Sequence, residues 1–280
     1  MEIKYIDIHS HLGFEDYGED QKEVIKRMQE AGVATIVVGA DLASSKEAVK
    51  VATENENVWA CIGMHPNHNV VEVFDEKEYE ELVKNPKVVA VGECGLDYHI
   101  APDLSLRGNP KQTRPDSLDC FTSFAMTEKK QKQKDDFIKQ IELAIKYKKP
   151  LMLHIRDAHD DAYEILKKYE GKVFGNLHFF TSTLENANRF IALGFTISFP
   201  GIITYVKDLD TIVKSIPLEM MHAETDSPFA SPVPYRGKRN EPSYVIEVYK
   251  KIAEIRGEDF EVVRQQLLNN ARRLFDISFV

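Results

Sequence analysis

Ile6-Asp7-Ile8-His9-Ser10-His11 is the stretch of sequence that decides the fold. Apolar and polar residues alternate along it, which is typical of a β-strand, and in a strand Asp7, His9 and His11 point to one face. Histidine is the commonest metal ligand, and two imidazoles one strand repeat apart can bind one ion from the same side. An exposed first strand with two surface histidines gives the same pattern. The decision depends on whether further His, Asp and Glu residues follow later strands.

Mostly apolar segments alternate with helical patterns along the rest of the chain. We predict strands at residues 5–9, 35–38, 58–62, 88–91, 151–154, 175–179, 195–199 and 220–223. Such strands, each followed by a helix, imply a parallel sheet that is buried on both faces. At 280 residues, we expect an α/β fold, a (β/α)8 TIM barrel, as a single domain over residues 1–280. A doubly wound open sheet is the alternative.

One segment interrupts the alternation. Residues 97–133 show no clear periodicity, and the next helix is predicted at 132–147. We therefore expect a loop insertion at about residues 100–132, after the fourth strand and on the face where barrels carry their active sites. The apolar run Cys120–Met126 predicts packing, either as a partly ordered lid on the barrel or against a second subunit. The oligomeric state stays open.

Composition limits the classes of protein. The formal net charge of −9 argues against a protein that coats nucleic acid or a membrane, but permits an enzyme with a local basic pocket. No apolar run approaches the roughly 18 residues of a transmembrane helix, and the start Met1–Lys4 does not resemble a signal peptide. Cys61, Cys94 and Cys120 have no CxxC spacing and are interpreted as reduced thiols, so we expect a cytoplasmic protein.

Metal-binding side chains follow five of the predicted strands, at their carboxyl ends. They are His9 and His11 on the first strand, Glu93 on the fourth, His154 on the fifth, His178 on the sixth and Asp226 on the eighth. In a barrel these ends open onto one face, so we expect the six side chains to converge. A single buried histidine is more often a core residue than a ligand, but six at one end favour a metal site.

Four imidazoles and two carboxylates exceed the needs of one tetrahedral ion. We expect two divalent ions about 3.5–4 Å apart that share a bridging carboxylate. Glu93 is the natural bridge, with His9, His11 and Asp226 on one ion and with His154 and His178 on the other. This mixture of nitrogen and oxygen ligands suits Zn, Mn, Fe or Co, and Mg less well.

These motifs resemble the TatD-type metal-dependent deoxyribonucleases, which belong to the amidohydrolase-like (β/α)8 barrels. The resemblance runs in order from Tyr5 to about Leu274, and further matches are 198–202 and 236–242. It rests on Asp7–His11, Gly92–Tyr98, His154–Ala158, His178 and Glu224–Pro228. It implies that the same six residues bind metal, and that the activity is hydrolysis of DNA phosphodiesters, commonly from the 3′ end and sometimes at abasic sites.

The chain departs from the family pattern at three places. Phe179-Phe180-Thr181-Ser182 replaces the usual Cys-Phe-Ser-Gly, and Asn67 stands where many members have a further histidine. The third departure is the insertion itself. None of the three departures changes an expected metal ligand, so they affect the expected substrate preference only.

We therefore expect a two-metal deoxyribonuclease that acts on DNA, as single strands or 3′ ends, through a metal-activated water. Asp226 is the expected general base and Glu93 the bridging carboxylate. Asp97 is expected to orient a ligand or cap a turn. Expected substrate contacts, from basic, aromatic and rim positions, are Arg156, Tyr98, His65, Arg236 and Arg239.

Two alternatives stay open. The same site can hydrolyse an ester or amide, for example to remove a D-amino acid from tRNA, because a metal-activated water attacks a carbonyl as readily as a phosphoryl group. A binding or scaffold protein on an inactive barrel is the third interpretation, but none of the six expected ligands is missing.

Overall fold

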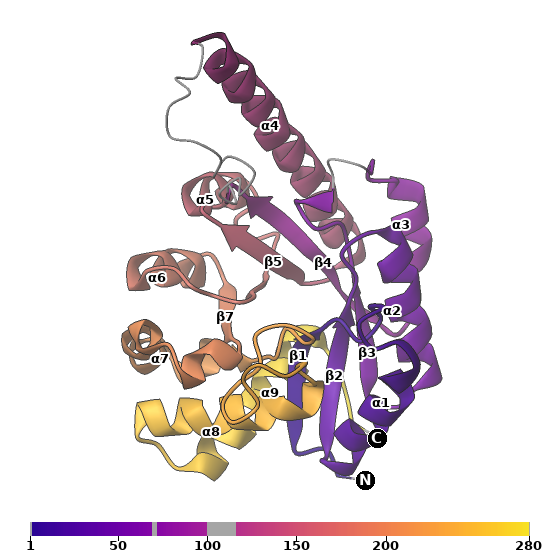
Figure 1. The fold of residues 1–280 in the computed structure, drawn as a ribbon, viewed down its shortest axis with the longest axis vertical. Coiled ribbons are helices and arrows are strands. Elements are labelled where there is room, and N and C mark those ends of the chain that lie inside the picture. Colours follow the sequence, from indigo (N-terminus) through magenta and orange to yellow (C-terminus); the bar gives the residue numbers. More distant parts are fainter. Residues whose placement is uncertain (1, 69–71, 100–115, 280) are drawn as a thin grey trace, which may run out of the picture.

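Eight parallel strands form one sheet in sequence order (Figure 1). The computed structural model describes residues 2–68, 72–99 and 116–279, with the backbone only for 116–126. The strands are β1 (Tyr5–Ser10), β2 (Val33–Val38), β3 (Val58–Ile62), β4 (Val88–Asp97), β5 (Leu151–Arg156), β6 (Gly175–Leu177), β7 (Phe195–Phe199) and β8 (Met221–Ala223). This confirms the predicted single-domain (β/α)8 barrel.

The barrel is nearly closed between its first and last strands. Ser10 and Ser227 form an isolated parallel bridge there. The amide of Asp226 donates to the carbonyl of His9 (2.9 Å), and the amide of His11 donates to the carbonyl of Ser227 (2.7 Å). These bonds join the two chain segments that carry three of the expected metal ligands.

Helices follow the strands and cover the outside of the sheet. They are α1 (Gln21–Glu30), α2 (Leu42–Glu54), α3 (Glu76–Val83), α4 (Asp116–Tyr147), α5 (His159–Lys167), α6 (Leu184–Ala192), α7 (Asp210–Ser215), α8 (Val245–Arg256) and α9 (Phe260–Phe275). β2 and β3 are buried at every position, as strands covered on both faces should be. Apolar side chains of the helices pack on this sheet in one large core cluster.

Helix α4 begins at Asp116, sixteen residues before its predicted start, so the expected loop insertion at about residues 100–132 was wrong for 116–132. The first part of the expected insertion, residues 100–115, lies outside the described residues. Residues 128–136 are almost entirely charged or polar. They favour a helix by propensity but carry no apolar stripe, and periodicity is the signal used to recognise one. Figure 1 shows α4 projecting past the barrel. The side chains of 120–126 lie outside the described residues, so lid and subunit contact both stay predictions.

Strand β4 runs on to Asp97, although we expected it to end at Val91. Gly92 and Gly95 suggested a turn, but they lie within the strand at φ +150° and +140°. A Cβ at either glycine would approach the carbonyl oxygens of Met152 or His154 to 2.3 and 2.1 Å. The glycines therefore permit close contact with β5, and Glu93 lies inside the barrel wall.

The common face predicted for Asp7, His9 and His11 is wrong for Asp7. The register of β1 on β2 shifts between Asp7 and Ser10. Asp7 pairs with Thr35, whose hydroxyl bonds that of Ser10 (2.8 Å), so Asp7 shares a face with Ser10. Its carboxylate accepts the amide of Thr225 (2.8 Å) and links β1 to the end of β8.

Two further expectations concern cysteines and membranes. Cys61 and Cys94 are free, as predicted, and both are buried, while the side chain of Cys120 lies outside the described part. Among the described residues, no helix is both long and apolar enough to cross a membrane.

Candidate metal centre

All six expected metal ligands meet at the carboxyl end of the barrel. His9 lies in β1 and His11 just after it, Glu93 lies in β4, and His154 lies in β5. His178 and Asp226 follow β6 and β8 by one and three residues. Since parallel strands end at one face, residues more than 200 positions apart become neighbours.

Four of the donor atoms form a compact group. The Nε2 atoms of His9 and His11 are 3.2 Å apart and lie 3.5 and 3.7 Å from Glu93 Oε2. Both also face Asp226 Oδ1, at 3.6 and 3.3 Å. In a tetrahedral zinc site with bonds of about 2.0–2.1 Å, neighbouring ligand atoms lie about 3.3–3.4 Å apart. The observed distances fit one ion at the centre of this group.

A second group uses the other oxygen of Glu93. Glu93 Oε1 lies 2.8 Å from His154 Nδ1 and 2.7 Å from His178 Nε2, and these two nitrogens are 3.2 Å apart. His65 Nε2 also faces Glu93 Oε1, at 3.6 Å. The two carboxylate oxygens thus face two separate sets of donors, which is the geometry of a bridging ligand.

Neighbouring groups orient the donor rings. His11 Nδ1 bonds the carbonyl of Val38 (2.9 Å), which leaves Nε2 for a metal. His154 Nε2 bonds Asp97 Oδ2 (3.3 Å), and Asn67 donates to the same oxygen (2.7 Å). Asp97 therefore lies where the prediction of an orienting residue requires it, and Asn67 holds Asp97.

Burial and nearby charges set the protonation of these donors. Burial lowers the pKa of His9 to about 4, and the nearby His178 contributes, so His9 is neutral at pH 7 with a free lone pair. Burial raises the pKa of Glu93, but His178 and the hydrogen bonds from His154 outweigh it and bring the pKa well below its usual range. The site therefore combines an ionised carboxylate with a neutral imidazole at His9. Burial also lowers the pKa of His11, His154 and His178, but the carboxylates that face these rings outweigh burial and raise it, so an ion that binds there displaces a proton.

Five of the six donors line a cavity of about 570 Å³, and the sixth, His9, is fully buried. Phe14, Phe179 and Phe229 line it together with Ile155, Thr181 and Arg156. Phe14 stacks on His11, with ring centroids 4.3 Å apart, and Phe229 is 49% exposed. Sequence reasoning noted Phe179 as a departure but missed Phe14 and Phe229, because neither belongs to a periodic pattern or a chemical motif.

The residues expected to contact substrate separate into two sets. His65 and Arg156 line the cavity. The other three, which are not among its lining residues, have partners elsewhere. Tyr98 donates to Asp161 (2.8 Å), Arg236 lies over the Tyr205 ring (4.3 Å), and Arg239 bonds Asp20 (3.0 Å).

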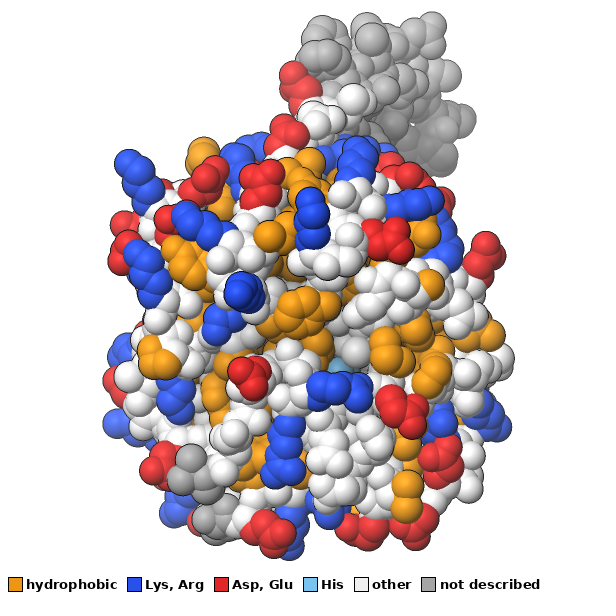
Figure 2. Space-filling model, turned by 180° about the vertical axis from the view of Figure 1, so that it is seen from behind, with side chains coloured by type: hydrophobic (Ala, Val, Ile, Leu, Met, Phe, Trp, Pro, Cys, Tyr) orange, Lys and Arg blue, Asp and Glu red, His pale blue; other side chains and the backbone are white. Residues whose placement is uncertain are grey.

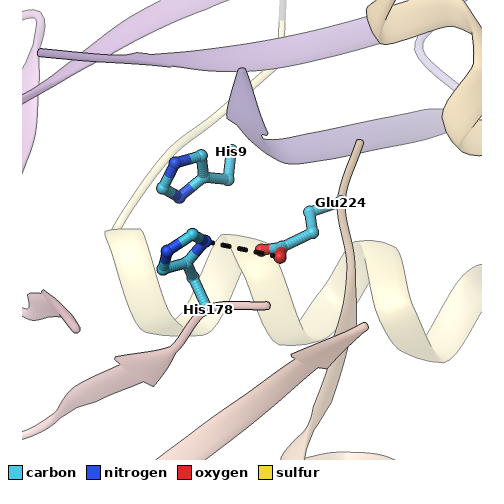
Figure 3. A group of neighbouring side chains, drawn as sticks. All are labelled: His9, His178 and Glu224. Carbon is cyan, nitrogen blue, oxygen red and sulfur yellow. Dashed lines mark ion pairs between the residues drawn. The ribbon is translucent and has the colours of Figure 1, made fainter. Parts of the chain in front are cut away.

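Figure 3 shows an acidic residue to which the sequence assigned no role. Glu224 lies beside the stacked rings of His9 and His178, behind the cavity. An acidic residue at the end of a short apolar strand, two positions before Asp226, was the available signal.

A (β/α)8 barrel whose carboxyl end gathers histidines and carboxylates around shared centres defines the class of metal-dependent hydrolases. Residues 6–276 match the family model described as "TatD related DNase", so the chain belongs to the TatD family. The "uncharacterized metal-dependent hydrolase" YabD of Bacillus subtilis is 37% identical over 281 residues, covering 97% of this chain and 99% of YabD.

Two other relatives support this family assignment. YcfH of Escherichia coli K12, also described as an uncharacterized metal-dependent hydrolase, is 33% identical over 97% of this chain and 96% of its own length. The crystal structure of YjjV, a TatD homologue from Escherichia coli K12, superposes with a TM-score of 0.83 at 26% identity, covering 99% of this chain and all of YjjV.

Proposed function

We propose that this protein is a divalent-metal-dependent deoxyribonuclease that uses two ions and removes nucleotides from the 3′ end of single-stranded DNA. The observation that carries the proposal is the cavity, which has metal donors at its floor, aromatic rings at its rim and an exposed arginine beside them. The word DNase in the description of the matching family supports the choice of substrate.

The size and lining of the cavity suit one nucleotide at a chain end. About 570 Å³ lies within the usual range of small-molecule sites, about 300–1,000 Å³. Aromatic rings bind bases by stacking, and an arginine binds a phosphate through paired hydrogen bonds. Phe229 and Arg156 would therefore hold a terminal base and its phosphate.

The charge distribution favours local recognition over binding along a long duplex. The net charge is −9. On the face shown in Figure 2, the coloured basic and acidic side chains are interspersed and form no continuous basic track. A protein that covers many phosphates needs such a track, whereas a chain end needs only the cavity.

The two sets of donor atoms would hold two divalent ions, and Glu93 contributes one oxygen to each set. When bound, such ions lower the pKa of a coordinated water and offset the charge that develops on the phosphoryl oxygens. Asp226, whose Oδ1 faces both His9 and His11, accepts the proton from the attacking water. Arg156 orients the phosphate for in-line attack, and the phenylalanines, which lie beside the donor rings, limit the access of bulk water.

The test is release of acid-soluble nucleotide from 3′-labelled single-stranded DNA. Metal-stripped protein is supplied with Mg, Mn, Zn or Co, and Asp226→Ala is compared with Asp208→Ala, an exposed carboxylate outside the cavity. We expect metal-dependent release that is abolished in Asp226→Ala and kept in Asp208→Ala.

The alternative is an ester or amide hydrolase such as a D-aminoacyl-tRNA deacylase, because the apolar rim would also accept an acyl side chain. No release with any ion, from protein shown to bind metal, would contradict the nuclease proposal and move the search to misacylated tRNA. A scaffold protein would behave identically in all variants and all assays.

A further inference from the structure

Glu224 is a fully buried carboxylate (0% exposed) that the proposed reaction does not use. We propose that Glu224 is a positioning residue: it binds the Nδ1 sides of His9 and His178, one ligand from each donor group, and so sets the affinity for both ions. This inference rests on the metal site of the proposed function but not on the identity of the substrate.

The carboxylate of Glu224 is held in place from two sides. Its Oε1 accepts the backbone amide of Phe179 (2.6 Å), and its Oε2 accepts the hydroxyl of Ser198 (2.6 Å). Asn176 in turn donates to the Ser198 hydroxyl (2.7 Å). Glu224 is therefore fixed by β6, β7 and the segment after β6, and it cannot rotate away from its neighbours.

The fixed carboxylate faces both histidine rings. His178 Nδ1 lies 3.5 Å from Glu224 Oε1, the contact drawn in Figure 3. The His9 ring stacks on that of His178, with centroids 3.9 Å apart and planes at 14°. A donor atom of each of the three residues lies within 4.8 Å of the other two.

The histidines need an acceptor at this position. The Nδ1 atoms of His9 and His178 are buried and have no hydrogen-bond partner among the described residues. An imidazole that binds metal through Nε2 carries its proton on Nδ1, and that proton requires an acceptor. The Nε2 atoms of both rings face Glu93. The Nδ1 atoms lie on the other side of each ring, and for His178 this side faces Glu224 at 3.5 Å.

A third metal ion between these three residues is the competing role. It would require both imidazoles to bind metal at both ring nitrogens, and therefore to lose both ring protons. The two oxygens of Glu224 also already accept hydrogen bonds from Phe179 and Ser198. An acceptor role gives the two Nδ1 protons a partner without these costs.

The test measures metal binding and needs no substrate. Wild type, Glu224→Gln and Asp97→Asn are titrated with Co²⁺ against a chromophoric chelator, and the visible Co²⁺ spectrum is recorded. Loss of a residue that hydrogen-bonds a metal-binding side chain typically weakens metal affinity about 10–100-fold. Under the proposal, Glu224 binds one ligand of each group, so Glu224→Gln should weaken both binding steps by this factor. Asp97→Asn, which among the ligands affects His154, should weaken one.

Glu241→Gln is the control, since it removes a buried carboxylate that pairs with Arg27 away from the cavity. It should bind two Co²⁺ with wild-type affinity. Wild-type affinities and spectrum in Glu224→Gln would overturn the inference, as would three Co²⁺ per wild-type chain and two in Glu224→Gln. A wild type that binds no Co²⁺ would instead overturn the metal site of the proposed function, and the inference with it.

Discussion

Replacing Phe229 by alanine tests the aromatic rim directly. The ring lies at the mouth of the cavity and is 49% exposed, so its removal costs little packing in the core. The side-chain amide of Asn240 donates to the Phe229 carbonyl (2.6 Å), and this bond does not depend on the ring. The backbone of the loop should therefore keep its place in Phe229→Ala.

The expected loss follows from the exposed area of this ring. An aromatic side chain buries about 150–250 Å², so about 100 Å² of Phe229 is available to a stacked base. At about 25 cal/mol per Å² this area is worth at most ~2.5 kcal/mol, and base–aromatic stacking is worth about 1–3 kcal/mol. Phe229→Ala should raise KM for single-stranded DNA about 5–70-fold. The kcat should change little, because stacking acts equally on bound substrate and transition state.

The assay is steady-state release from a 3′-labelled oligonucleotide, with Val233→Ala as the matched control. Val233 lies four residues further along, is 46% exposed and is not among the residues that line the cavity, so its loss should leave KM unchanged. An unchanged KM in Phe229→Ala would refute base stacking at this rim. An equal rise in both variants would indicate a general effect on the loop.

Two further predictions concern stability. Metal binds only the folded site, so each ion present at 100 times its Kd adds about 2.7 kcal/mol to the free energy of unfolding. Stripping two ions with a chelator should therefore lower Tm by roughly 10 °C in a melting experiment. Equal Tm values with and without metal would show that no ion is bound. Burial lowers the pKa of His222 to about 3, and neither of its ring nitrogens has a hydrogen-bond partner among the described residues. The unfolded chain therefore binds a proton at pH 6.5 that the folded chain takes up only near pH 3, so His222 costs about 1.4 kcal/mol of stability per pH unit as pH falls through this window. In urea unfolding of metal-free protein, His222→Leu should become more stable than wild type by this slope below pH 6.5, and parallel curves for the two proteins would contradict it.

The strand pattern and the ligands were predictable because both are local properties. β3 was predicted at its observed residues, since its apolar run ends at a glycine. His154 and His178 were identifiable because each ends a predicted strand, as the other expected ligands do, and parallel strands of a barrel end at one face. The early start of α4 was not predictable, because residues 128–136 are charged or polar and give no apolar period.

The parts of the site that depend on three dimensions could not be predicted. Asp7 leaves the face of His9 because β1 shifts register on β2, and neither strand's residues encode a bulge. Phe14 and Phe229 meet at one rim although they are far apart in the sequence, since loops after β1 and β8 open onto the same face. Glu224 faces His178 only because β6 and β8 flank β7.

The sequence by itself determined the architecture, the family and the chemical identity of the donors, because apolar periodicity and residue type act over a few neighbouring positions. Only the tertiary structure decided which donors share a centre. The opposed oxygens of Glu93 and the contact of Asp226 with His9 arise when the barrel closes, at the two hydrogen bonds between the ends of β1 and β8. Distances between residues that lie more than 200 positions apart are set by the closure of the whole sheet, so a local sequence pattern cannot predict them.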